Sequence, residues 1–331
     1  MHTIQSARAP STQACYSQKW GVFSDWCHNK QLDPVICSVH SILGFLQSLL
    51  DLGRASSTVK VYVAAISSFH QPVDGQAVGK HPLVSQFIKG ARRLRPGRAL
   101  RAPSWDLATV LHSLTLAPYE PLDHADLKFL TQKTVFLLVI CSAKRVSELH
   151  ALSVSEQCLR WKAEYSGVSL WPNPSFLPKV VNPQTVNQVI EISSFHPESA
   201  PTGDNLVNLC PIRALRIYVT RTQSLRHTHS QLFVCYGGVK RGNPVSKQSL
   251  SHWVVDAIAQ AYDSLPVPGN LVAHSTRSMA TSWAALRGVS VAEICAAASW
   301  SAPCTFARFY RVNVAAPAPL SEAVLSVARR L

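Results

Sequence analysis

HSTRSMATSW (residues 274–283) and ASWSAPCTFARFYRV (residues 298–312) decide the fold, and both lie near the C-terminal end of a chain of 331 residues. His274 and Arg277 are three residues apart, which places them on one face if the stretch is helical. Trp300 follows Arg277 by 23 residues, and Tyr310 follows Trp300 by ten. Each residue alone has a plain structural interpretation: His274 as a helix-terminal residue, Trp300 and Tyr310 as core aromatics. Their joint spacing is the feature to be explained.

The charge of the chain indicates a polyanionic partner. There are 32 Lys and Arg residues against 18 Asp and Glu, a formal net charge of +14 and a pI of about 9.6. Nucleic acid and anionic membranes are the usual partners of such a surplus. The longest apolar run, VFLLVIC (135–141), is far shorter than the roughly 20 residues of a membrane span. The first 20 residues have no apolar signal-peptide core, which favours an intracellular protein.

Nine cysteines are scattered through the chain, and no two are spaced as CxxC. This pattern predicts reduced thiols and no metal site. His227 and His229 form a lone HxH that a solvated loop explains better than a metal pair.

Residues 13–95 have the apolar spacing of a small helical bundle, after a loose segment 1–12. Gly53 is expected as a helix C-cap, and Ser56 or Ser57 as the N-cap of the next helix. The expected helices are 13–29, 36–52, 57–70 and 82–95.

RRLRPGRALR (92–101) carries five arginines around a Pro-Gly pair, so a linker is expected at 96–104. A solvated linker is one interpretation. In a chain this basic, a segment that follows a phosphate backbone is the preferred one. The candidate DNA-binding residues are Lys60, Arg92, Arg93, Arg95, Arg98 and Arg101.

Residues 105–331 form a second, larger domain in which strands and helices do not alternate. A β-rich stretch is expected at 157–195, a short strand at 231–236 and a turn at 237–244. Helices are expected at 108–114, at 126–141 as a buried central helix, at 211–222, at 246–265 and over most of 275–330. The predicted fold class is mainly α with a small antiparallel β-sheet (α+β).

Arg145 and Glu148, in KRVSELHAL, repeat the three-residue spacing of His274 and Arg277. A surface ion pair is the plain interpretation of that pair alone. If the groups converge on one phosphodiester, each residue type has a role. Arginines hold the phosphate oxygens with donors that do not titrate, tyrosine supplies a nucleophile, and histidine moves a proton.

This ordered set resembles the tyrosine recombinase family. The resemblance spans roughly 13–312, and the spacing from Trp300 to Tyr310 is one residue longer than is common in the family. It is closest to the recombinases of DIRS- and Ngaro-type eukaryotic retrotransposons, through CSAKRVSELHAL (141–152), PNPSFLPKV (172–180), HSTRSMATSWA (274–284) and FARFY (306–310).

The resemblance implies a function and a role for each matching residue. Arg145 and Arg277 would bind the scissile phosphate, with His274 assisting proton transfer, Trp300 supporting the phosphate or packing the site, and Tyr310 forming a 3′-phosphotyrosine. Glu148 would orient its neighbours. The family lysine would be Lys179, with Lys162 in reserve, although three prolines near Lys179 interrupt a simple strand.

The resemblance also makes residues 13–95 a core-binding domain that clamps duplex DNA. It implies a tetramer on DNA, no metal or other cofactor, integration of mobile-element DNA, and a nuclear location. Residues 317–331 are a short amphipathic segment that would pack on a neighbouring subunit or on its own domain. Three alternatives stay open: a type IB topoisomerase-like enzyme, an inactive DNA-binding protein derived from a mobile element, and a basic RNA-binding or scaffold protein.

Overall fold

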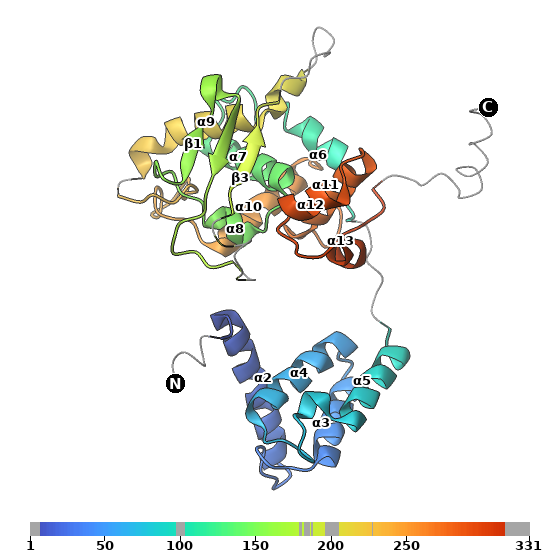
Figure 1. Cartoon of the computed structure of the whole chain (residues 1–331). Coiled ribbons are helices and arrows are strands. Elements are labelled where there is room, and N and C mark those ends of the chain that lie inside the picture. The colour runs from blue at the N-terminus through green and yellow to red at the C-terminus, as the bar shows by residue number, and fades with distance from the viewer. Residues whose placement is uncertain are drawn as a thin grey trace, which may run out of the picture. The chain divides into compact units, whose positions relative to one another are not determined.

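The computed structural model describes residues 7–96, 103–178, 181, 186, 188–195, 205–226 and 228–314. The chain divides into two compact units, Met1–Ala99 and Leu100–Leu331. The division falls within the predicted linker 96–104, most of which lies outside the described residues, as do Arg98, Arg101 and the segment 317–331. Figure 1 shows the two units, each of which is described by itself below.

The first unit is a helical bundle. Its core is aromatic: the ring centroids of Phe23 and Phe45 are 5.0 Å apart, and those of Phe45 and Tyr62 are 5.6 Å apart. Tyr62 is therefore a core residue. The elements are α2 (Pro10–His28), α3 (Val39–Asp51), α4 (Ser56–Phe69), the 3₁₀-helix η1 (Val78–Lys80) and α5 (Pro82–Leu94).

Two details of this bundle differ from the prediction. The predicted loose segment 1–12 runs into α2, which begins at Pro10 because proline fits the first turn of a helix, where its missing N–H is not needed. Neither Ser56 nor Ser57 caps α4. The N-cap is Ala55, and the Ser56 hydroxyl donates instead to the Arg95 carbonyl at 3.4 Å. Gly53 follows α3 with φ of +83°, as predicted for a C-cap glycine.

The second unit is built on a three-stranded antiparallel sheet in the order β1-β2-β3. The strands are β1 (Leu159–Trp161), β2 (Gly167–Leu170) and β3 (Ile190–Ser193). Val168, Leu170, Ile190 and Ile192 are buried, so one face of the sheet joins the core. The predicted mainly α fold with a small antiparallel sheet is confirmed.

Helices α7 and α9 pack against this sheet, and α7 is the central helix of the unit. It packs against α9, α10 and α11 and against β3, and most of its residues are buried, as the sequence predicts. The helices are α6 (Leu107–Ser113), α7 (Leu127–Ser142), α8 (Val146–His150), α9 (Pro211–Thr222), α10 (Lys247–Gln260), α11 (Ser275–Leu286), α12 (Val291–Ala297) and α13 (Pro303–Phe309). Short 3₁₀-helices lie at η2 (Ala163–Tyr165), η3 (Asn205–Leu209) and η4 (Gln223–Leu225).

The strand predicted at 231–236 is wrong. Only isolated bridges form there, Ser153 with Gln231 and Val234 with Pro244. The Val234–Pro244 bridge is flanked by hydrogen bonds from the Cys235 amide to the Asn243 carbonyl at 2.9 Å and from the Val245 amide to the Phe233 carbonyl at 3.3 Å, but no continuous strand forms. The turn expected at 237–244 is present.

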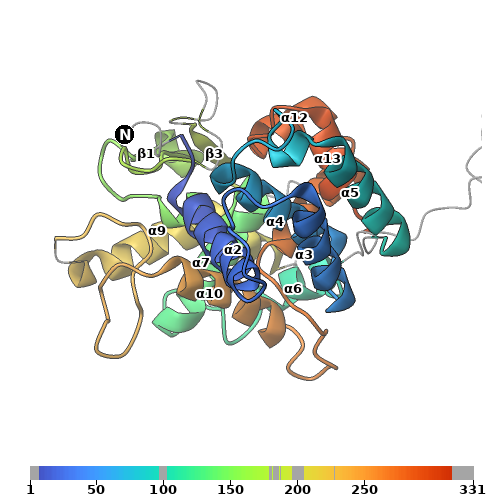
Figure 2. The ribbon, with the colours of Figure 1, turned by 90° about the horizontal axis from the view of Figure 1, so that it is seen from below.

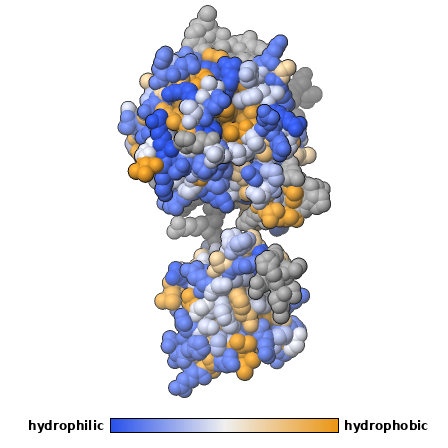
Figure 3. All heavy atoms as spheres, turned by 90° about the vertical axis from the view of Figure 1, so that its left-hand side faces the viewer, coloured by the Kyte–Doolittle hydropathy of each residue, from blue (hydrophilic) through white to orange (hydrophobic). Residues whose placement is uncertain are grey.

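The surface of both units is mostly hydrophilic. Figure 3 shows one face of each unit, where hydrophilic side chains cover most of the area and hydrophobic ones gather in patches. No described helix is long and apolar enough to cross a membrane. All nine cysteines lie in the described part of the chain and are unpaired.

Candidate active site

Three C-terminal helices and the turn before α8 form the candidate site. Figure 1 shows α11, α12 and α13 side by side, α12 and α13 also lie together in Figure 2, and α11 packs on both α12 and α7. The start of α11 is anchored by the Ser275 hydroxyl, which accepts from the Trp105 indole at 2.9 Å and donates to the Val272 carbonyl at 2.6 Å. His274 and Arg277 are therefore presented by a fixed helix end.

Arg277 is the most deeply buried cation of the site, with 1% of its surface exposed. Its guanidinium carbon lies 4.9 Å from the ring centroid of Trp300 and 5.4 Å from that of Tyr310. Its Nη2 donates to the Ala298 carbonyl, while Nε and Nη1 have no hydrogen-bond partner among the residues that the structure describes. Two charged donors at the centre of the cluster thus lack a hydrogen-bond acceptor there.

Tyr310 ends α13 and lies against both His274 and Trp300. The ring centroids of Tyr310 and Trp300 are 4.4 Å apart, and those of Tyr310 and His274 are 5.5 Å apart. Trp300 is buried, and its indole N–H also has no hydrogen-bond partner. His274 is exposed to solvent, so the phenol lies between an exposed imidazole and a buried guanidinium.

The backbone of Tyr310 is held by a residue that sequence reasoning missed. Ser282, buried on α11, donates its hydroxyl to the Tyr310 carbonyl at 3.2 Å and accepts from the Val312 amide at 3.0 Å. Because Ser282 and Arg277 share α11, the nucleophile candidate and the arginine are joined through one helix.

Arg145 and Glu148 complete the cluster at the start of α8. A Glu148 oxygen accepts from the Arg145 backbone N–H at 2.7 Å and lies 3.9 Å from Arg145 Nη1 and 3.6 Å from Arg277 Nη1. The Arg145 side chain is 26% exposed. Glu148 thus lies between the two arginines without a close hydrogen bond to either guanidinium.

The pKa of Arg277 depends on its burial and on its charged neighbours. Arg145 lowers this pKa, whereas Glu148 and Tyr310 raise it. Burial is the largest cause, and it lowers the pKa of Arg277 to about 10. The side chain is still protonated at neutral pH. The cluster therefore holds a permanent positive charge where an anion would be stabilised.

The predicted lysines are placed differently. Lys179 lies outside the described residues. Lys162, at the end of β1, is exposed, and its ammonium is 2.8 Å from Glu191 on β3. A third lysine, Lys144, was missed: it is buried immediately before Arg145. Its only sequence signal is its place beside the arginine of KRVSEL.

The predicted DNA-binding residues of the first unit lie on two helices. Lys60 is exposed on α4, and Arg92 and Arg93 are exposed in the last turn of α5, with Arg95 as its C-cap. Their exposure leaves them available for an anionic partner.

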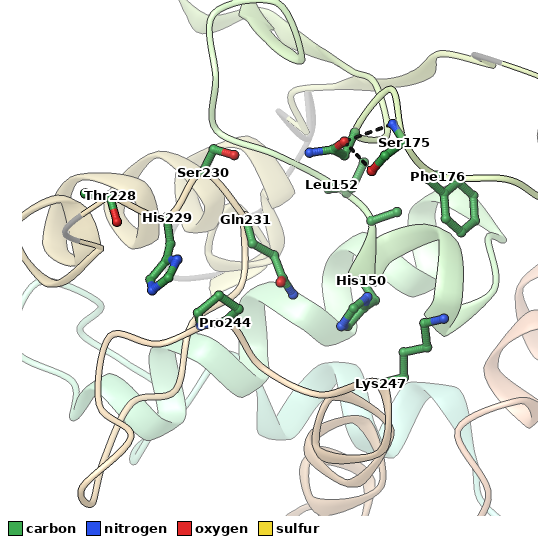
Figure 4. Close-up of a pocket in the computed structure, with 12 residues that line it drawn as sticks. His150, Leu152, Ser175, Phe176, Thr228, His229, Ser230, Gln231, Pro244 and Lys247 are labelled. Atoms are coloured by element: carbon green, nitrogen blue, oxygen red, sulfur yellow. Dashed lines mark hydrogen bonds between the residues drawn. The ribbon is translucent and has the colours of Figure 1, made fainter.

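A hollow of about 510 Å³ lies at the C-terminal end of α8, away from the cluster at its start (Figure 4). His150, at the end of α8, and Lys247, at the start of α10, lie on one side of it, and Thr228 and His229 on the other. His150 Nε2 donates to the Val245 carbonyl at 2.9 Å. The residues that line the hollow include basic and hydroxyl groups but no carboxylate.

No family model and no curated protein matches the chain. Solved structures do match. A lambda integrase dimer (75–356) bound to a COC′ core site is 13% identical, with a TM-score of 0.54 and 96% of each chain covered. The Tn1549 transposon integrase in complex with transposon right end DNA is 10% identical, with a TM-score of 0.54 over 88% of this chain and 85% of that one. The XerH site-specific recombinase bound to a palindromic difH substrate is 11% identical, with a TM-score of 0.52 over 88% of this chain and 73% of that one. The chain therefore has the fold of the tyrosine recombinases and integrases.

Proposed function

We propose that the chain is a tyrosine recombinase that breaks and rejoins duplex DNA through a covalent link between Tyr310 and a 3′ phosphate. Arg145, His274, Arg277, Trp300 and Tyr310 come from three separate stretches of sequence and meet in one cluster on a matching fold. Glu148 bridges Arg145 to the others.

The observation that carries the proposal is the set of free donors beside the phenol. Nε and Nη1 of Arg277 and Nε1 of Trp300 are buried and have no hydrogen-bond partner among the described residues, and Nη1 is 3.6 Å from a Glu148 oxygen. Buried polar groups are nearly always hydrogen-bonded, so such a group calls for a missing partner. A phosphodiester supplies anionic oxygens that would accept from all three donors. Because Arg277 is 1% exposed, a phosphate would reach it only after the ring of Tyr310 or Trp300 moves.

The cleavage step balances without an outside co-reactant. The Tyr310 oxygen attacks phosphorus, its proton passes to His274, and the bond from phosphorus to the 5′ oxygen breaks. Arg145 and Arg277 stabilise the charge on the non-bridging oxygens. The 5′ oxygen leaves with a proton, for which Lys179 is the proposed donor. Rejoining reverses the step with a 5′ hydroxyl of another strand as nucleophile.

The link conserves the energy of the phosphodiester, so we infer that no ATP is consumed. Exchange between two duplexes needs four strand cleavages, which favours a tetramer on DNA. The lambda integrase match is a dimer bound to its core site, which supports assembly of more than one subunit on DNA. The transposon integrase match supports an origin in a mobile element.

DNA binding is proposed for both units. Lys60, Arg92, Arg93 and Arg95 would contact the phosphate backbone from the first unit. In the second, the hollow of Figure 4 offers His150, His229 and Lys247 to a phosphate near the one held at Arg145. The short α8 connects the two places.

Covalent trapping on nicked duplexes tests the proposal. A nick close to the cleavage point makes the strand that carries the released 5′ hydroxyl short enough to diffuse away, so the 3′-phosphotyrosine accumulates. A random-sequence pool would be mixed with the wild-type chain, with Tyr310→Phe, and with Tyr165→Phe as a control at a half-exposed tyrosine on η2. We expect a denaturation-resistant adduct in the wild type and in Tyr165→Phe, and none in Tyr310→Phe. Duplex binding without an adduct would favour an inactive DNA-binding protein, and adduct formation by Tyr310→Phe would refute the nucleophile assignment.

A further inference from the structure

Two turns of the second unit face each other behind the candidate site. One joins α7 to α8 and contains Ala143, and the other follows α12 and contains Ser299. Both residues have left-handed backbone angles, with φ of +51° and +54°. Residues other than glycine adopt this region at an energetic cost. Ala143 packs in one cluster with Ala298 and Trp300, so the two turns are in contact.

Lys144 joins these turns by hydrogen bonds. Its ammonium, on the first turn, donates to the Ser299 hydroxyl at 2.6 Å and to the Gln188 amide oxygen at 3.0 Å. The Ser299 hydroxyl also donates to Gln188, and the Gln188 amide nitrogen donates to the Ala296 carbonyl at 2.9 Å. We name Lys144, Gln188 and Ser299 the lysine clasp.

The clasp reaches three parts of the candidate site. Lys144 precedes Arg145 in the chain, and Ser299 precedes Trp300. Gln188 ends the connection between β2 and β3, which also carries Lys179. Pro172, Phe176 and Pro178 of that connection line a small cavity of about 20 Å³ beside Lys144, Glu148 and Gln188. One side chain therefore contacts the Trp300 turn and the β2–β3 connection and directly precedes Arg145.

A positive charge at this point is unusual. Lys144 is buried, and its pKa is lowered to about 8, first by burial and then by Arg277 and Arg145, against the opposing effect of Glu148. An apolar side chain of the same length would avoid that desolvation cost. Such an apolar side chain could not make the hydrogen bonds that Lys144 donates to Gln188 and Ser299.

We propose that Lys144 is a positioning residue that holds the Trp300 turn against the Arg145 turn, so that Trp300 and Arg277 are set for the phosphate. This role rests on the proposed DNA cleavage, but the contact itself does not. The ammonium is buried and bonded to two side chains, which distinguishes Lys144 from a proton donor that must reach the leaving oxygen. Lys179 or Lys162 would fill that second role.

Hydrogen exchange tests the contact without DNA or activity. The amides of Ser299 and Trp300 donate to the carbonyls of Ala296 and Cys295 at 3.1 and 2.8 Å, so they are protected when the turn is closed. We expect Lys144→Met to raise exchange in residues 296–302 about tenfold, because the turn opens more often. Lys128→Met, at the exposed start of α7, is the matched control and should leave that exchange unchanged.

Ser299→Ala gives a second variant that leaves the buried lysine in place. If Lys144 acts through Ser299, the double variant should exchange no faster than Lys144→Met alone, whereas independent roles would add. Unchanged exchange in both single variants would overturn the proposal. So would a loss of protection spread evenly over α11, α12 and α13, which would indicate general destabilisation.

Cleavage of two matched substrates separates positioning from proton donation. One nicked duplex has the natural 5′ oxygen at the cleavage point, and the other has a 5′ sulfur, which leaves without needing a proton. We expect Lys144→Met to slow adduct formation about a hundredfold on both substrates, because misplaced groups cost about this factor. Recovery on the sulfur substrate would make Lys144 the proton donor and refute the positioning role. If the wild-type chain cleaves neither substrate, the proposed function fails, while the exchange result still decides whether Lys144 holds the turn.

Discussion

In the second unit, Glu120 lies between Lys133 and Arg213, while Glu148 lies between Arg145 and Arg277. The Glu120 cluster is closed, by which we mean that its basic groups already have hydrogen-bond acceptors. Arg213 donates to both carboxylate oxygens at 2.8 and 3.0 Å, and Lys133 donates to the same carboxylate and to the Leu114 carbonyl.

The Glu148 cluster is open, by which we mean that some of its donors lack acceptors among the described residues. Its carboxylate is 3.6 and 3.9 Å from the nearest guanidinium nitrogens, and two nitrogens of Arg277 have no hydrogen-bond partner. The same set of charges, two basic groups and one carboxylate, can therefore serve either stability or binding. The two clusters differ in whether the nitrogens of the basic groups already have hydrogen-bond acceptors.

The largest expected effect is at the centre of the open cluster. Arg277→Met should slow adduct formation about 10²–10³-fold, because it removes fixed donors from the charged transition state. Its free energy of unfolding should stay the same or rise, since an apolar side chain avoids burying a cation. Single-turnover trapping and urea unfolding measure the two effects. A loss of several kcal/mol would show that Arg277 is structural, as Lys133 is.

The closed cluster should respond in the opposite way. Lys133→Met removes a fully buried partner of Glu120 and should cost roughly 3 kcal/mol of unfolding free energy. The rate of adduct formation per folded molecule should not change. Lys128→Met on the same helix is the control and should change neither quantity. An unchanged stability in Lys133→Met would remove the distinction between the clusters.

Alkaline pH should stabilise the wild type through Lys144. Its pKa is about 8 in the folded state and ordinarily 10.5, so between these values the unfolded chain binds more protons. The cost of the buried charge is fully present below pH 8 and disappears as pH rises to 10.5. From pH 8 to 9.5 the gain should be about 2 kcal/mol relative to Lys144→Met. Unfolding of both chains across this range measures the difference, and parallel curves would contradict the assignment.

The smallest expected effect is on anion binding. Glu148→Gln removes the negative charge between Arg145 and Arg277, so inorganic sulfate should bind about fivefold tighter, on the order of 1 kcal/mol. Thermal unfolding with increasing sulfate reports the affinity. Glu120→Gln is the matched control: it should lower stability without changing the response to sulfate. Equal responses in both variants would mean that the Glu148 cluster is no more open than the other.

The sequence predicted the regular elements well where periodicity is strong. The helices of the first unit, the buried α7 and the antiparallel sheet follow from apolar spacing. The strand expected at 231–236 failed because its residues form only isolated bridges to two separate segments, Gln231 to Ser153 and Val234 to Pro244. The cap at Ser56 failed because α4 begins at Ser56 itself, with Ala55 in the N-cap position.

The residues of the candidate site were named from spacing and resemblance, but the residues that hold them in place were not. Arg145, Glu148, His274, Arg277, Trp300 and Tyr310 were named from their order in the chain. Lys144 and Ser282 act across 155 and 28 residues, and no local pattern marks such contacts. Lys133 on an apolar helix likewise has no local sign of its partner Glu120.

The most direct test of the account is the identity of the residue that carries the DNA. The adduct trapped on nicked duplexes would be digested with nuclease and protease, and the peptide carrying a nucleotide would be sequenced by mass spectrometry. We expect the nucleotide on Tyr310, joined through a 3′ phosphate. A nucleotide on any other residue, or joined through a 5′ phosphate, would contradict the account.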